Sequence, residues 1–365
     1  MIRDNYLEKY MNNAGSILVT GGAGFIGSHT SLLLLERGYR IIIVDSFINS
    51  YPESLKRIEQ ILKTKNYKFD NQILLYKGCL TNKDFIYKVF SEVEKKGINI
   101  NAVIHFAGLK SVGDSISNSI SYYEQNVISI INLLLVMQSF FCRTIVFSSS
   151  ATIYKSQGNK LLNEECELKA INPYAQTKIV IERILSDLYK SQNNNWRIMN
   201  LRYFNPIGAH PSGLIGESPK GFLNNLFPLI LEVASKSNYQ LKIFGNNWPT
   251  KDGTCIRDYI HVMDLAEGHI KALEFLKESE PNIYSMNLGT GKGTSVMDLI
   301  NIFESINNVK IDYVISGRRI GDLPFLVADN RYAKKLLNWN PSRTLEKMCA
   351  DGWNWKIRNP DGYNF

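Results

Sequence analysis

Two residues four positions apart, Tyr174 and Lys178, have side chains that could perform acid–base chemistry. They fall in a stretch of about 174–190 that begins after Asn172-Pro173 and has a helical pattern. Residues i and i+4 lie on one face of a helix, and a lysine cation beside a phenol favours the proton-accepting phenolate. Tyr-x-x-x-Lys alone is more often part of an ordinary amphipathic helix, so its meaning depends on the rest of the chain.

A cluster of hydroxyls precedes this pair. The segment RTIVFSSS predicts a buried strand over 143–148 that runs into hydroxyl side chains and ends at Ser150. In open parallel sheets, ligands bind outside the carboxyl ends of the strands. Ser150 is therefore placed to hydrogen-bond a reacting oxygen.

A glycine-rich turn near the start of the chain predicts a nucleotide site. In ILVTGGAGFIGS, a short apolar run leads to Gly21, Gly24 and Gly27, and a helical pattern follows. Glycine allows the backbone to turn sharply and approach a pyrophosphate, to which the helix N-terminus offers free N–H groups. The spacing is G-x-x-G-x-x-G, and such a pattern is weak evidence unless its context agrees.

An acidic residue at the end of the next strand supplies that context. The run RIIIVD predicts a strand over 40–45, and Asp45 follows Gly27 by 18 residues. An acid at this spacing is typical of the residue that holds the adenosine ribose hydroxyls, and it repels a 2′-phosphate. The pattern favours NAD over NADP, although a solvated aspartate ending a strand is the simpler alternative.

The elements that must position these residues alternate between strand and helix. The alternation predicts an α/β fold with a doubly wound parallel sheet of the Rossmann type. The expected strands are 16–20, 40–45, 73–77, 102–106, 143–148 and 196–204, and the expected helices of this half are 25–37, 82–96, 117–139 and 174–190.

The chain changes character after this sheet. Residues 206–225 are rich in proline and glycine, and the elements expected beyond them are a strand at 241–244, helices at 262–277 and 295–305, a strand at 311–315 and a helical C-terminal part. We expect an extension at 1–14, a nucleotide-binding domain at 15–205, and a smaller α/β substrate lobe at 206–365. The two lobes should interweave, and the smaller one should close over the carboxyl edge of the sheet.

Composition narrows the class of protein. The 365 residues carry a net charge of +8, but Lys and Arg are spread along the chain without a basic block or nucleic-acid motif. No apolar run is long enough to span a membrane. The five cysteines are scattered without a Cys-x-x-Cys pair, which argues against disulfides or a zinc site and favours a reducing cytoplasm.

Taken together, the motifs resemble the extended short-chain dehydrogenase/reductase family, and within it the epimerases that act at carbon 4 of UDP-hexoses. The similarity covers about 16–363 and is carried by VTGGAGFIGSH, VIHFAGLKSVGDS, FSSSATIY, YAQTK, LRYFNPIGAHPSG, IFGNNWPTKDGTCIRDYIHVMDLA and GRRIGDLP.

The resemblance implies roles for individual residues. Tyr174 would be the catalytic base, Lys178 its partner, and Ser150 the hydroxyl that orients the substrate. NAD would contact Gly21, Gly24, Phe25, Ile26, Gly27, Asp45, Ser46, Phe47, Ile48, Asn49, Ser50, Cys79, Leu80, Phe106, Ala107, Gly108, Lys110, Gln125, Ser150, Tyr174, Lys178 and Phe204. The UDP-sugar would contact Ser150, Tyr174, Asn205, Asn225, Leu226, Phe244, Arg257, Tyr259, Arg319, Asp322 and Leu326.

The implied reaction interconverts UDP-glucose and UDP-galactose. Hydride leaves carbon 4 for NAD, a transient 4-keto sugar turns over, and hydride returns to its other face. NAD is regenerated in each cycle, so we expect tight retention. UDP-N-acetylglucosamine or another UDP-hexose is the alternative substrate.

Two other classes are weaker alternatives. A sugar-nucleotide 4,6-dehydratase or decarboxylase shares the first step, but a dehydratase needs a carboxyl acid after the strand hydroxyl, where this chain has Ala151 and Thr152. A non-catalytic NAD-binding scaffold would not need Tyr174 and Lys178.

Three positions depart from the family pattern. Cys79 replaces an acid that contacts adenine in relatives, so we expect looser adenine contact or a substitute from a backbone group. Gln125 stands where asparagine is common. Leu326 borders the 2-substituent of the sugar and is intermediate in size between the residues of relatives.

A homodimer is also implied. Relatives pair helices corresponding to about 117–139 and 174–190, and the first of these is apolar nearly all round in this chain. Complete burial of that helix within the monomer is the alternative.

Overall fold

The computed structural model describes residues 15–363 except 68, 70, 192–194, 222, 237–238 and 320. The predicted extension at 1–14 lies outside the described residues. Among the residues that are described, no helix is both long and apolar enough to cross a membrane.

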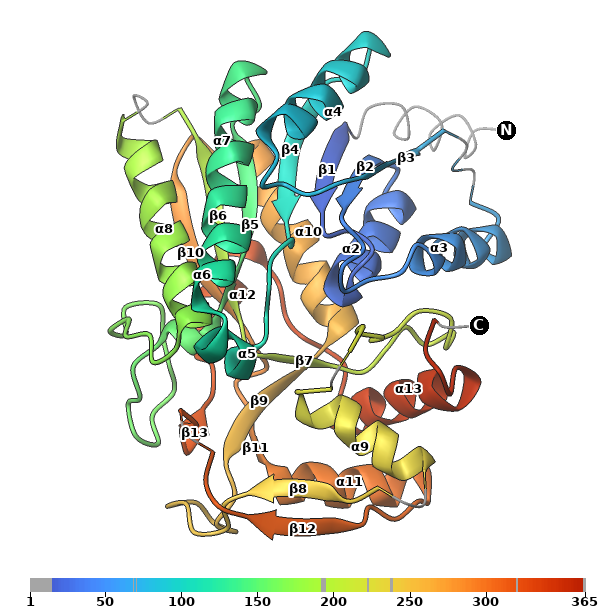
Figure 1. Ribbon diagram of the computed structural model, residues 1–365, viewed down its shortest axis with the longest axis vertical. Coiled ribbons are helices and arrows are strands. Elements are labelled where there is room, and N and C mark those ends of the chain that lie inside the picture. Colours follow the sequence, from blue (N-terminus) through green and yellow to red (C-terminus); the bar gives the residue numbers. More distant parts are fainter. Residues whose placement is uncertain are drawn as a thin grey trace.

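A parallel seven-stranded sheet forms the centre of the larger region (Figure 1), which confirms the predicted fold class. Its strands in spatial order are β10 (Ile283–Leu288), β6 (Arg197–Tyr203), β5 (Thr144–Ser150), β4 (Ile100–His105), β1 (Ser16–Thr20), β2 (Arg40–Asp45) and β3 (Ile73–Lys77). The chain order reverses between β1 and β4, which places a ligand crevice at their carboxyl ends.

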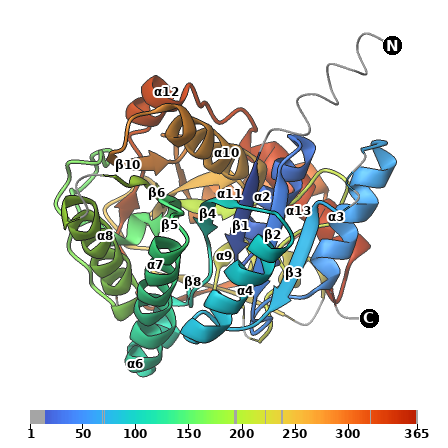
Figure 2. The ribbon, with the colours of Figure 1, turned by 90° about the horizontal axis from the view of Figure 1, so that it is seen from above.

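Helices cover both faces of this sheet because its strands are apolar on both sides (Figure 2). Ile17 and Val19 of β1 pack toward α2 (Phe25–Glu36), α3 (Glu53–Thr64) and α10 (Val262–Glu278). Leu18 points the other way, toward α4 (Lys83–Lys95), α7 (Ser129–Ser139) and α8 (Pro173–Ser191). The period of two along the strand thus builds two separate cores.

The expected helix over 117–139 is broken into several pieces. It is preceded by α5 (Val112–Ser117) and consists of α6 (Ser119–Tyr122), a π-helical turn η1 (Tyr123–Ile128) and α7. Asn118 leaves the helical backbone region, which separates α5 from α6. The π turn brings Asn126 under the loop after β4, where its amide accepts from Leu109 N at 2.8 Å. The apolar residues that predicted one continuous helix give no sign of such a turn, which is common beside functional sites.

The second region lies beyond the carboxyl edge of the large sheet (Figure 1). Its sheets are formed by β9 (Ile256–His261), β7 (Asn205–Ile207), β11 (Gly293–Ser295) and β13 (Phe325–Leu326), and by β8 (Leu241–Phe244) with β12 (Tyr313–Ser316). Helices α9 (Leu226–Ser235), α11 (Val296–Asn307) and α13 (Leu345–Arg358) enclose its own apolar core. Strand β10, helix α10 and α12 (Arg331–Leu337) return to the large sheet or its helices, so the chain crosses between the regions more than once.

Candidate active site

A cavity of about 510 Å³ lies between the two regions, at the carboxyl ends of the large sheet. Residues from both regions line it, including every residue predicted for the site except Phe47. The backbone of Phe47 is left-handed, with φ of 57°, and its ring packs against the apolar core of the large sheet. Phe47 therefore contributes its backbone to the loop and not its side chain to the cavity, and its contact with NAD stays a prediction.

The glycine turn is shaped as a cradle that side chains would fill. A Cβ on Gly21, where φ is +68°, would lie 2.8 Å from Ala107 N, and one on Gly27 would lie 2.2 Å from Gly21 O. Helix α2 begins after Gly24 without a side-chain cap, and its first residues line the cavity. The close backbone and the uncapped helix N-terminus fit a dinucleotide pyrophosphate.

Asp45 organises the loop that follows β2. Its carboxylate accepts hydrogen bonds from Ala23 N at 3.0 Å, Phe47 N at 2.9 Å and Ser50 Oγ at 2.7 Å. A carboxylate offers about four acceptor positions, so one remains for a ligand hydroxyl. The arrangement fits the predicted ribose contact.

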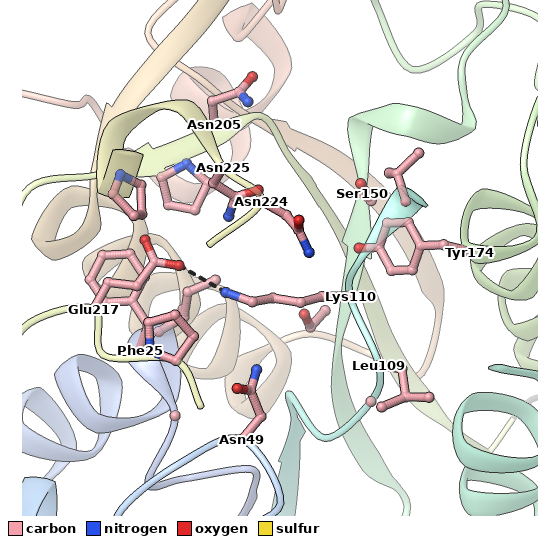
Figure 3. A pocket seen from close by; sticks show the side chains of 18 of the residues that line it. Phe25, Asn49, Leu109, Lys110, Ser150, Tyr174, Asn205, Glu217, Asn224 and Asn225 are labelled. Carbon is pink, nitrogen blue, oxygen red and sulfur yellow. Dashed lines mark hydrogen bonds and ion pairs between the residues drawn. The ribbon is translucent and has the colours of Figure 1, made fainter. Parts of the chain in front are cut away.

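Three side chains with catalytic potential converge where β5 meets α8. Ser150 ends β5, and Tyr174 lies in the first turn of α8, which Asn172 caps by accepting from Ala175 N at 2.8 Å. Lys178 is one turn further, and its Nζ lies 5.8 Å from the centroid of the Tyr174 ring. Figure 3 shows Ser150 and Tyr174 on one side of the cavity and Asn205 and Asn225 facing them.

Burial governs the protonation of this group. It raises the pKa of Tyr174, and a hydrogen bond with Ser150 opposes that rise. Burial also lowers the pKa of Lys178 to about 8, against the pull of Glu182. The sequence predicts that Lys178 favours the Tyr174 phenolate, whereas burial of Tyr174 favours the neutral phenol. The Lys178 ammonium donates to Ser148 O at 2.8 Å, which fixes it one turn from Tyr174.

Sequence reasoning missed Tyr203, which lines the cavity beside Tyr174. Its hydroxyl hydrogen-bonds the Ser148 hydroxyl, and burial raises its pKa. The signal was available in the strand pattern, because Tyr203 ends β6 as Ser150 ends β5, and the two are register partners.

The far end of the cavity carries paired charges. Arg319 Nη2 lies 2.8 Å from Asp322 Oδ1, and Arg257 Nη2 lies 3.7 Å from the same oxygen. Arg257 also donates to Leu323 O at 2.7 Å. Two guanidinium groups that share one carboxylate could instead pair with a diphosphate, whose oxygens suit their planar forks.

Cys79 and Gln125, two of the residues that depart from the family pattern, contact each other. The Cys79 thiol donates to Gln125 Oε1 at 3.4 Å and lies 3.1 Å from Thr81 Oγ1. Both line the cavity on the side of the glycine turn. Thr81 and Gln125 thus both give polar partners to the thiol that replaces the expected acid.

A doubly wound sheet, a glycine cradle and a Tyr-Lys pair define a nucleotide-dependent enzyme of the extended short-chain dehydrogenase/reductase class. The sequence model of the family described as GDP-mannose 4,6 dehydratase matches residues 18–352, and the chain belongs to this family.

Its relatives show to which group of enzymes within the family the chain is most similar. The chain is 45% identical over 351 residues to UDP-glucose 4-epimerase 2 of Arabidopsis thaliana, covering 96% of this chain and 97% of that one. It is 46% identical over 349 residues to UDP-glucose 4-epimerase of Bacillus subtilis, covering 95% and 98%. The crystal structure of UDP-glucose 4-epimerase from Bifidobacterium longum in complex with NAD+ and UDP matches with a TM-score of 0.88 and 41% identity, covering 95% of this chain and 100% of that one. Within the family, this chain thus falls among the UDP-glucose 4-epimerases.

Proposed function

We propose that this chain interconverts UDP-glucose and UDP-galactose with bound NAD, as part of galactose metabolism. The observation that carries the proposal is the junction of β5 and α8, where Ser150, Tyr174 and Lys178 line a cavity shared with the glycine cradle and the Arg257–Arg319 pair. We assign the dinucleotide to residues 15–205 and the sugar nucleotide mainly to the lobe at 206–365.

In this mechanism the protein holds the diphosphate and leaves the sugar free to turn. Tyr174 accepts the proton of the 4-hydroxyl, and Ser150 hydrogen-bonds the same oxygen. Lys178 stabilises the negative charge that Tyr174 acquires when it is deprotonated. The glycine cradle and Asp45 would hold NAD, which would supply the acceptor for the hydride of carbon 4 and its donor for the return. Arg257 and Arg319 keep the diphosphate in place while the 4-keto sugar presents its other face.

The dehydratase reaction named by the family model is less compatible with this site. Ala151 and Thr152 follow Ser150 in the short 3-10 helix η2 (Ala151–Ile153), and neither can protonate a leaving hydroxyl as a carboxylic acid does. Thr152 instead hydrogen-bonds Ser150, with 3.0 Å between the hydroxyl oxygens.

The test is proton NMR of the purified protein mixed with UDP-glucose and no added NAD. We expect UDP-galactose to appear until an equilibrium mixture is reached, which requires a retained cofactor. Inactivity after NAD is also supplied would contradict the proposal. The same assay with UDP-N-acetylglucosamine measures how far Leu326, which lines the cavity, admits a larger 2-substituent.

We further propose a cytoplasmic homodimer. Helices α5 to α7 expose a row of apolar side chains, with Ile120 80% exposed and Ile116, Tyr123, Ile128, Ile131 and Leu135 also exposed. The opposite face, which includes Leu133 and Met137, is buried in the core beside the sheet. This division corresponds to a helix that has one covered and one uncovered face. All five cysteines are free, as suits a reducing compartment.

Light scattering coupled to size exclusion tests the dimer. Ile120→Asp with Ile131→Asp should give a monomer, because each places a charge in the apolar row. Ile357→Asp, at an exposed position on α13, is the matched control and should remain dimeric. A wild-type monomer would contradict the proposal.

A further inference from the structure

Residues 216–220 belong to the second region, and Gly216 to Pro219 line the cavity. Contacts near both ends of this segment join it to loops of the first region. At one end, Glu217 Oε1 lies 2.9 Å from Lys110 Nζ, on the loop after β4 (Figure 3). At the other end, Lys220 N donates to Asn49 Oδ1 and Lys220 Nζ donates to Phe47 O, both at 2.8 Å. Asn49 and Phe47 belong to the loop after β2.

The far side of the same segment is anchored to the C-terminal part of the chain. Trp355 Nε1 donates to Glu217 O at 3.2 Å, and Tyr363 N donates to Ser218 Oγ at 3.2 Å. Gly216 N donates to the Tyr363 hydroxyl at 3.1 Å, and a Cβ on Gly216 would lie 2.5 Å from the Trp355 ring. The segment is thus held firmly to its own region, and its contacts with the other region are few.

Those few contacts lie on either side of the glycine cradle. Lys110 follows β4, Asn49 follows β2, and the cradle follows β1, which lies between them in the sheet. Figure 3 shows Glu217 close to Phe25, the first residue of α2, with its ion pair to Lys110 extending across the cavity and Asn49 nearby. Glu217 to Pro219 line the cavity together with the cradle.

We propose that residues 216–220 form a strap that retains the dinucleotide, with Glu217 and Lys220 as its fastening residues. The inference rests on the proposed function, since it assumes that NAD occupies the cradle. The fastenings join two loops that flank the cradle, so a bound dinucleotide leaves only when they release. The Lys110 and Glu217 side chains are 48% and 9% exposed, so their pair is shielded from water on one side. Such contacts act on the dissociation rate, because they exist only in the closed state.

The experiment measures exchange of bound NAD. Wild-type protein and the variants Glu217→Gln, Lys220→Ala and the double variant are purified, and bound NAD is quantified by chromatography after denaturation. Each protein is then mixed with isotope-labelled NAD, and the rate at which label enters the protein is recorded. We expect each single variant to exchange about threefold faster and the double variant about tenfold faster, the range for loss of partly exposed polar contacts.

Lys155→Ala is the matched control. It removes an ion pair of similar length, 2.6 Å to Glu167, that is not on the strap, and it should exchange NAD at the wild-type rate. Lys220 is exposed, so its single variant keeps the test available if the double variant fails to fold. A double variant with the wild-type exchange rate would overturn the strap. Wild-type protein that binds no NAD at all would overturn the proposed function itself.

Discussion

The two ends of the cavity present their polar groups in different ways. Around β5 and α8, the reactive side chains are buried and fixed to the framework: Lys178 is 5% exposed and donates to a backbone carbonyl. Around Asp322, the charged groups are paired mainly with each other, and the Arg319 side chain is 51% exposed. The first end depends on strands and a helix, whereas the second takes Arg319 and Asp322 from the loop between β12 and β13 and only Arg257 from a strand, β9.

This contrast explains how one cavity can hold a substrate tightly and still let it turn. Groups that handle a proton must keep their geometry, so backbone partners and burial suit them. Groups that bind an anion can form a mutual pair before the anion arrives, because the Asp322 carboxylate neutralises the two guanidinium groups until a diphosphate pairs with them. We therefore expect substitutions at the first end to lower turnover and those at the second to weaken binding.

Tyr174→Phe should have the largest effect of all, at the end of the cavity formed by β5 and α8. It removes the hydroxyl that accepts the proton, so kcat should fall about 10³-fold, within the range for general-base catalysis. Steady-state kinetics measures the loss. The fold, by circular dichroism, and the bound NAD should be unchanged because the ring remains in place. A variant with turnover near wild type would exclude Tyr174 as the base.

Arg319→Ala should have the next largest effect, at the end of the cavity around Asp322. Loss of a charge-assisted bond to the diphosphate should raise KM about 10- to 100-fold and leave kcat within a few-fold of wild type. Arg318→Ala is the control, because the Arg318 guanidinium lies 4.1 Å from the Trp248 ring centroid and does not line the cavity. Equal effects of the two substitutions would argue against a diphosphate site here.

The same contrast explains how much could be predicted from the sequence. The ranges of β1, β2 and β3 are those expected, because short apolar runs between turn residues specify buried strands locally. Helix α3 and strand β10 were not predicted. The first is a polar-rich amphipathic helix in a long loop, and the second is a strand that joins the sheet from the far half of the chain.

The residues of the site also fall into those that the sequence predicted and those that it did not. Gly21, Ser150 and Tyr174 could be found because their chemistry depends on residue type and close spacing. Tyr203 was missed although it ends its strand as Ser150 does. Glu217 could not be found, because its role depends on the path of a loop rich in proline and glycine. Long-range placement of this kind comes from packing, which a local pattern does not contain.

Substitution of Lys178 should have a smaller effect, which should appear in the pH dependence of kcat. Lys178 remains largely cationic at pH 7 although burial lowers its pKa to about 8. Its charge favours the ionised form of Tyr174, whereas burial favours the neutral form. Lys178→Ala should therefore move the acidic limb of the kcat profile to higher pH by about one unit. Lys190→Ala, at an exposed position near the end of α8, is the control. An unchanged midpoint would show that Lys178 does not tune Tyr174.

The smallest expected effect concerns the framework on which both ends depend. His210 lies after β7, and its Nδ1 accepts from Ser212 N at 3.2 Å. Burial lowers the pKa of His210 to about 4, helped by the charge of Lys65 and opposed by Asp351. A histidine with a folded pKa below its unfolded value of about 6.5 contributes stability above pH 6.5 that is lost as the pH falls toward 4.

His210→Asn tests this contribution, because the Asn oxygen can replace the Nδ1 acceptor but does not titrate. We expect the wild-type free energy of unfolding, measured with urea, to fall between pH 7.5 and pH 5.8 by about 1 kcal/mol more than that of the variant. His29, His105 and His269 also have pKa values lowered by burial, so both proteins should weaken in acid. Only the difference between the proteins isolates His210. An identical fall in both would mean that His210 can gain a proton without cost. The segment after β7 would then be less rigid than the catalytic end of the cavity.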